Sequence, residues 1–164
     1  MRILIAALFA ISMAAFGQQS PATPKDKMVA EWTDVARKVN ALAAEFPEAK
    51  YDYRPTPEVR TFAQQMLHLA FWNQFVAKSA RGEKPDGKLN ELPRSEYKTK
   101  AAVTGALQDS FTGLLAALKA TSEEDIVKRI NLWATFLEHS GEHYGQAALY
   151  YRLNGLIPPE SRPK

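Results

Sequence analysis

Three histidines are the residues of this chain best suited to chemistry, and two of them lie four positions apart in the segment EHSGEHYGQ, residues 138–146. These two are His139 and His143, and the third is His68, far upstream. On a helix, side chains four residues apart lie above one another, about 5–6 Å apart. Two imidazoles placed in this way can bind one ion, at about 2.0–2.1 Å from each nitrogen if the ion is zinc.

The neighbours of each histidine indicate which way it faces. His139 and His143 fall on a stripe of large side chains spaced by four and three residues, and His68 is followed by aromatic residues at i+3, i+4 and i+7. We therefore expect all three to face the bundle interior. A buried imidazole needs a partner, and a shared divalent ion would serve all three. The alternative is that each histidine is a hydrogen-bonded core residue and binds no metal. The stripe residues are Leu132, Phe136, His139, His143, Gln146 and Tyr150.

The same segment also matches a second metal motif. Residues His139 to His143 read H-x-x-E-H, the inverted zinc-protease signature, with Glu142 as general base. Such enzymes use a further acidic ligand downstream, and Glu160 is the sole acidic residue after His143. A surface or supporting role for Glu142 is the favoured interpretation.

The elements that must position these residues are helices. Apolar residues alternate at steps of four and three from Met28 to Leu42, and further helices are predicted at about residues 61–82, 95–119 and 121–153, the last broken near Asn131. Thr61 with Gln64 forms a capping-box pattern, and Thr121–Ser122 marks another start. Sustained apolar–polar alternation is absent from the sequence. The fold class is therefore all-α, an antiparallel four-helix bundle.

The first seventeen residues, MRILIAALFAISMAAFG, have a different character. A positive start, a short apolar run and small residues at the end are typical of a cleavable signal peptide. We expect residues 1–17 to be removed, residues 18–25 to form a flexible linker and residues 26–161 to form the domain. Export to the periplasm or the exterior follows, without stable membrane insertion after cleavage. An uncleaved N-terminal anchor is the alternative.

The composition excludes several kinds of site and partner. The chain has 164 residues, no cysteine and a formal net charge of +3. Disulfides and thiolate ligands are therefore excluded, and the small charge argues against nucleic acid as a partner. At 46% apolar residues the chain can build a core.

Two separated segments carry a family resemblance. YDYRPTPEVRTFAQQMLH and the later EHSGEHYGQAALYYRLNGLIPPES resemble the DinB-like (DinB/YfiT-like) superfamily over about residues 28–161. The residues that match are Tyr51, Tyr53, Arg54, Pro55, Arg60, Thr61, His68, His139, His143, Tyr144, Gly145, Arg152, Asn154, Gly155, Pro158, Pro159 and Ser161.

The resemblance implies a four-helix bundle in which His68, His139 and His143 hold a divalent metal ion, zinc or nickel. It also implies a metal-dependent hydrolase or a group transferase, some relatives being transferases of thiols such as bacillithiol, mycothiol or glutathione. The substrate would be an unidentified small molecule, and a homodimer is one of the oligomeric states left open. A non-catalytic metal-binding or structural bundle is the alternative. Gln146 and Tyr150 are expected either to line the same cavity or, as the favoured interpretation, to pack beside the site.

Overall fold

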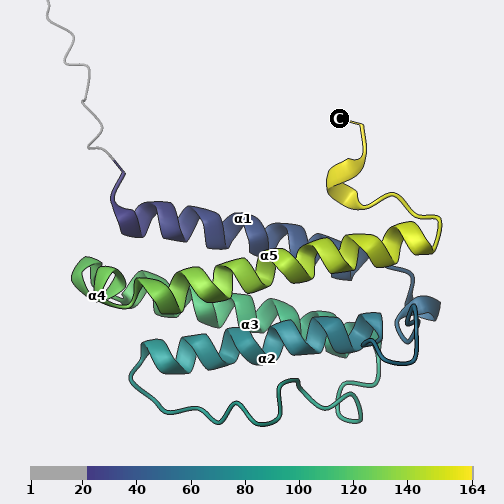
Figure 1. Cartoon of the computed structure of the whole chain (residues 1–164), viewed down its shortest axis with the longest axis horizontal. Coiled ribbons are helices and arrows are strands. Elements are labelled where there is room, and N and C mark those ends of the chain that lie inside the picture. The colour runs from purple at the N-terminus through teal and green to yellow at the C-terminus, as the bar shows by residue number, and fades with distance from the viewer. Residues whose placement is uncertain (1–21, 164) are drawn as a thin grey trace, which may run out of the picture.

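The computed structural model describes residues 22–163, which are helical and contain no strand. Figure 1 shows four long helices, α1 (Pro24–Glu45), α2 (Phe62–Ala80), α3 (Lys100–Ala120) and α5 (Ile130–Leu153), with the short α4 (Glu123–Lys128) between the last two. Two 3-10 turns complete the described chain, η1 (Glu48–Lys50) and η2 (Pro159–Ser161). The predicted signal peptide, residues 1–17, lies outside the described residues.

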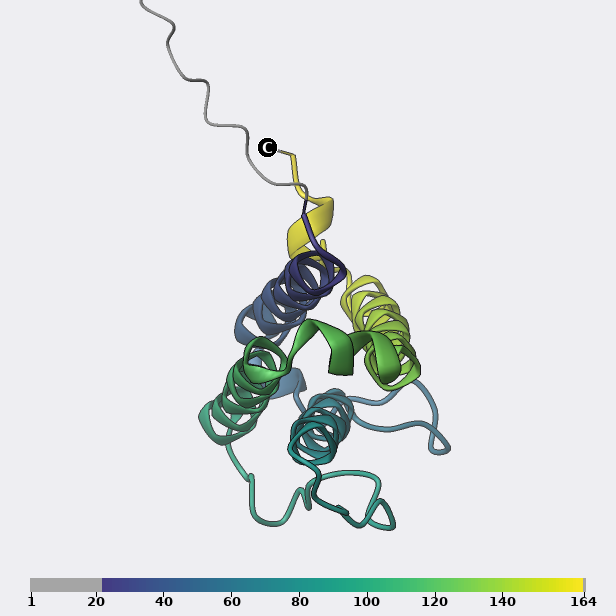
Figure 2. The same ribbon diagram turned by 90° about the vertical axis from the view of Figure 1, so that its left-hand side faces the viewer.

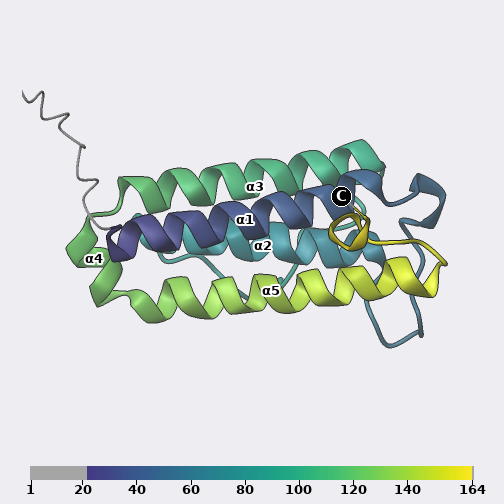
Figure 3. The same cartoon turned by 90° about the horizontal axis from the view of Figure 1, so that it is seen from above.

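The bundle is not antiparallel throughout. End-on, the four long helices occupy the corners of a square, with α1 beside α3 and α5, and α2 beside α3 and α5 (Figure 2). The colours of Figures 1 and 3 show that α1 and α5 run one way and α2 and α3 the other. The α1–α3 and α2–α5 pairs are therefore antiparallel as predicted, whereas α2–α3 and α1–α5 are parallel. Helices α2 and α3 are parallel because the segment 81–99 returns the chain along α2 before α3 begins.

Side-chain caps fix where the helices start. Thr61 accepts from the Gln64 amide while the Gln64 side chain accepts from the Thr61 amide, so the predicted capping box is present. Thr23 and Asp26 form a second box, which starts α1 at Pro24, two residues before the expected domain boundary. Each cap of this kind contributes about 1 kcal/mol.

Two predicted boundaries differ from the structure. The third helix begins at Lys100 rather than near Ser95, because Thr99 supplies the N-cap and residues 93–97 form turns held to other elements. Arg94, for example, forms an ion pair with Asp52. The break predicted near Asn131 falls at Arg129, whose guanidinium donates to the carbonyls of Ser79 and Ala80 at the end of α2.

The core is built from large side chains of all four long helices. Helix α2 is buried on nearly every side, because α3, α5 and the segment 81–99 surround it (Figure 2). Each of the largest side chains stabilises the fold by about 1.5–3 kcal/mol through burial. Within residues 22–163, no helix combines the length and apolar character that crossing a bilayer requires. The largest fully buried residues are Trp32, Phe46, Tyr51, Phe62, Phe111, Trp133 and Tyr151.

Candidate metal centre

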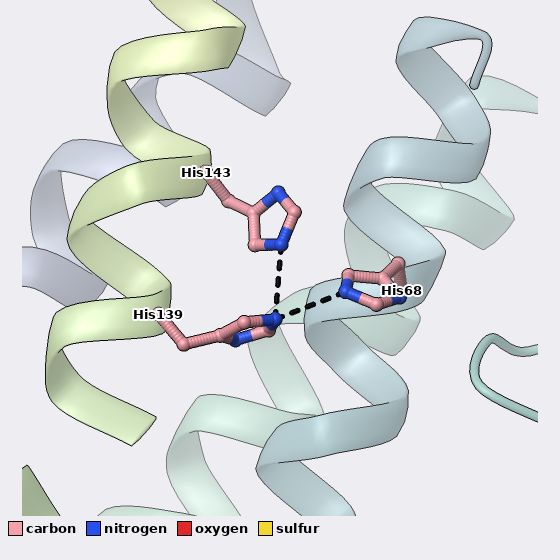
Figure 4. Close-up of side chains that lie close together, drawn as sticks. All are labelled: His68, His139 and His143. Carbon is pink, nitrogen blue, oxygen red and sulfur yellow. Dashed lines mark hydrogen bonds between the residues drawn. The ribbon is translucent and has the colours of Figure 1, made fainter. Parts of the chain in front are cut away.

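The three histidines meet at the seam between α2 and α5 (Figure 4). His139 and His143 project from successive turns of α5, and His68 faces them from α2. The Nε2 atom of His139 lies 3.0 Å from that of His68 and 3.0 Å from that of His143. These residues, the histidine cluster, therefore present three ring nitrogens to one point, within 4.8 Å of one another.

A backbone carbonyl sets the protonation of His68. Its Nδ1 lies 2.5 Å from the carbonyl oxygen of Asn90, in the segment 81–99. A carbonyl can only accept, so Nδ1 carries the proton and Nε2 is left with a free lone pair. Asn90 has a positive φ of 60°, and its side chain accepts from Trp72 Nε1 at 3.0 Å. The segment 81–99 thus prepares His68 as a ligand through Nε2.

The other two rings differ in their surroundings. His143 Nδ1 lies 2.6 Å from the side-chain amide nitrogen of Gln65, and the same amide nitrogen contacts Gln146 Oε1. His139 Nδ1 is buried and has no hydrogen-bond partner among the described residues.

Protons alone cannot satisfy the histidine cluster. A neutral imidazole has one N–H, and His68 uses its own on Asn90. The Nε2 atom of His139 takes part in both 3.0 Å contacts and can either donate or accept, but not both. In every arrangement of the neutral rings, at least one contact is therefore not a hydrogen bond: either two lone pairs face each other, or an N–H faces a nitrogen that cannot accept. A cation placed among the three lone pairs removes this conflict, so the donor set fits a metal ion.

The spacing of the nitrogens fits the same interpretation. Two nitrogens about 2.0–2.1 Å from one ion lie about 2.9 Å apart at a right angle and about 3.3 Å apart at the tetrahedral angle. The observed 3.0 Å falls between these values. Three ligands on one side of an ion leave at least one position for another molecule, which is the arrangement of catalytic rather than closed structural sites.

Electrostatics keep the cluster neutral. Burial is the main cause that lowers the pKa of His68 to about 4, with the charge of Arg60 adding to it. Burial, followed by the neighbouring His139 and His68, lowers the pKa of His143 to about 3. Burial also lowers the pKa of His139, against the opposing charge of Glu142. All three are therefore neutral at pH 7, as metal binding requires.

The cluster lies at the edge of the core rather than at its centre. Leu132, Phe136 and His139 are only half-buried, whereas Trp133, one residue along, is fully buried. The stripe predicted to face the bundle interior therefore faces the α2–α5 seam. His68 and His143 are nevertheless only 5% and 6% exposed, because Trp72 and the Asn90 carbonyl lie against His68 and Gln65 lies against His143. The site is sheltered and close to the surface.

A pocket of about 590 Å³ lies beside Gln65, which contacts His143, and the three histidines are not among the residues that line it. Gln65 and Gln146, which contact one another, form the wall nearest His143. Tyr150, whose hydroxyl donates to the carbonyl of Arg60 at 2.5 Å, lines it too. Gln146 and Tyr150 thus line the pocket, which is the less favoured of the two roles expected for them. The lining residues are Pro55, Glu58, Val59, Arg60, Gln65, Glu91, Gln146, Leu149 and Tyr150.

The sequence analysis predicted some of the other residues near the site and missed others. Glu142 is exposed, which favours its surface role over that of a general base. Arg60 forms an ion pair with Glu91 at 2.8 Å. The sequence did not single out Gln65, Asn90 or Glu91. Gln65 precedes His68 by three residues, a spacing that places both on one face of α2 and could have drawn attention to it.

Comparison with known proteins identifies the family. The family model described as the DinB superfamily matches residues 31–150, most of the chain. Among curated proteins and among solved structures, none matches. The matched region includes all three histidines and both helices that carry them. With its helical bundle and its histidine cluster, this chain belongs to the DinB superfamily.

Proposed function

We propose that the protein binds one divalent metal ion, zinc or nickel, through the Nε2 atoms of His68, His139 and His143. The observation that carries this proposal is the convergence of three neutral ring nitrogens, two pairs of them at 3.0 Å. When bound, such an ion supplies Lewis acidity to a water, thiol or carbonyl group.

We further propose that the protein is a metal-dependent hydrolase or thiol transferase that acts on a small molecule. Support comes from the pocket of about 590 Å³ beside the cluster, a size suited to small ligands. Its walls combine apolar side chains such as Val59 and Leu149 with the charged Arg60 and Glu91. In this proposal the chain binds and orients the substrate there, and Trp72 and Phe136 exclude bulk water from the rings.

A second candidate is a metal-binding bundle without catalysis. One observation favours it. Glu91, an acidic residue of the pocket whose charge acts on His68, already accepts from Arg60 and Gln64. These contacts on both of its oxygens count against a role as general base.

Elemental analysis tests metal binding directly. Purified protein is reconstituted with zinc or nickel, desalted and analysed beside His139→Ala and His143→Ala. Glu138→Ala serves as the matched control, because Glu138 is an exposed neighbour of His139 on the same helix. We expect one equivalent of metal in the wild type and the control, and none in the histidine variants. Equal metal in all four proteins would refute the site.

Catalysis is tested on the metal-loaded protein. Ester and amide hydrolysis and the conjugation of low-molecular-weight thiols to electrophiles are measured, with the His143→Ala protein as the blank. Activity in the wild type that the blank lacks supports an enzyme. Full metal occupancy without activity in either assay supports the non-catalytic bundle.

Export is proposed from the pattern of residues 1–17. Expression of the full chain in a bacterial host, followed by mass measurement of the periplasmic fraction, tests it. A mature protein that begins at Gln18 is expected. A full-length chain in the membrane pellet would support the uncleaved anchor instead.

A further inference from the structure

Gln65 occupies a special position between the histidine cluster and the pocket. Its side chain is 2% exposed, and its amide lies 2.6 Å from Nδ1 of His143 on one side and in contact with Gln146 on the other. It also lines the pocket wall. A buried amide so placed must satisfy both neighbours, because an unpaired polar group there is costly.

Two hydrogen-bond arrangements satisfy these neighbours. In the first, the Gln65 amide nitrogen donates to both His143 Nδ1 and Gln146 Oε1, and the His143 proton must then sit on Nε2. In the second, both amides are turned by half a rotation, so that Gln65 Oε1 accepts from His143 Nδ1–H and from the Gln146 amide. Gln146 is exposed and therefore free to turn.

Only the second arrangement is compatible with a metal ligand. A ring nitrogen binds a cation through its lone pair, so His143 can use Nε2 only when its proton is on Nδ1. His68 already has this tautomer, since the carbonyl of Asn90 accepts from its Nδ1. The Gln65 amide lies against His143 Nδ1, and once it is turned its oxygen accepts from Nδ1–H in the same way. The Gln146 side chain also hydrogen-bonds His143.

We propose that Gln65 is a positioning residue that accepts a hydrogen bond from His143 Nδ1 and thereby frees Nε2 for the metal ion, with Gln146 completing the amide pair. The inference rests on the proposed metal site. It means that two of the three ligands are oriented by acceptors from different elements, Asn90 in the segment 81–99 and Gln65 on α2.

Substitutions that keep the length of residue 65 and change its hydrogen-bonding groups test this role. Gln65→Met keeps the length and removes both donor and acceptor. Gln65→Glu keeps an acceptor and cannot donate. The control is Gln74→Met, the same replacement about two and a half turns further along α2. Zinc affinity is measured by competition with a chelator, and folding is checked by circular dichroism.

We expect Gln65→Met to weaken zinc binding by about tenfold to a hundredfold, as is usual when the partner of a ligand is removed. Gln65→Glu should bind zinc no more weakly than the wild type, and Gln74→Met should match the wild type. A Gln65→Met protein that binds like the wild type, or a Gln65→Glu protein as weak as Gln65→Met, would overturn the proposal. A wild type that binds no zinc would instead refute the metal site itself.

A second readout avoids mutation altogether. Nitrogen-15 NMR of the zinc-loaded wild type reports which ring nitrogen of His143 carries the proton. We expect Nδ1–H, held in a hydrogen bond and therefore in slow exchange with water. A proton on Nε2 of His143 in the zinc-loaded protein would overturn the proposal, even if the Gln65→Met variant failed to fold.

Discussion

Acidification from pH 7 to pH 5 should destabilise the metal-free protein through its buried histidines. In the unfolded chain His68 and His143 have the ordinary pKa of 6.5, whereas in the folded protein burial lowers these pKa values to about 4 and about 3. The unfolded state therefore takes up protons first as the pH falls. The stability that comes from neutral histidines is complete above pH 6.5 and is lost as the pH falls towards these folded values.

The magnitude follows from the two pKa values. Between pH 7 and pH 5, each unfolded histidine gains about 2 kcal/mol from protonation that its folded counterpart does not. The two together lower the free energy of unfolding by about 4 kcal/mol, a large part of the roughly 5–15 kcal/mol of a typical domain. The lowered pKa of His139 adds a loss of the same sign.

Urea unfolding of chelator-treated protein at pH 7, 6 and 5 measures this loss. The window lies above the range where the stabilised carboxyls of Asp34 and Glu160 titrate, because their pKa values are lowered by Lys38 and by Arg37, respectively. The matched control is the His68→Gln/His143→Gln protein, which should keep only the dependence due to His139. A wild type whose unfolding free energy is the same at pH 7 and pH 5 would refute the reasoning.

Three further outcomes follow from the structure. Zinc at about 100 times its Kd should raise the free energy of unfolding of the wild type by about 2.7 kcal/mol. In calorimetry this corresponds to a rise in Tm of roughly 5–10 °C for a chain of this size, whereas the Tm of His139→Ala should stay unchanged. Asn90→Ala should cost about 1–2 kcal/mol in urea unfolding, because alanine disfavours the positive φ of this position; Asn90→Gly should restore the backbone part but not the contact with Trp72. Thr61→Ala should cost about 1 kcal/mol through loss of the cap of α2, whereas Thr61→Ser should retain stability in the same assay.

Much of the site could be predicted from the sequence because its ligands obey local rules. The four-residue spacing of His139 and His143 places both rings on one face of α5, and aromatic neighbours indicated that His68 is sheltered. That His68 lies opposite this pair depended on the family resemblance, since periodicity cannot say which helices adjoin. The partner of His68 depends on a loop conformation: Asn90 reaches it through a backbone carbonyl, which carries no side-chain signature.

The length of the segment 81–99 links the topology to the site. Helix α2 has 19 residues, or about 28 Å of length, and a connection that spans up to about 3.3 Å per residue can return along all of it. The chain then enters α3 parallel to α2, and the returning segment covers the face of α2 that the other helices leave open (Figure 1). This cover places the Asn90 carbonyl on His68 and Glu91 beside Arg60. A short turn here would have produced an antiparallel α3 and left His68 Nδ1 to solvent, so the parallel topology and the prepared metal ligand have one cause.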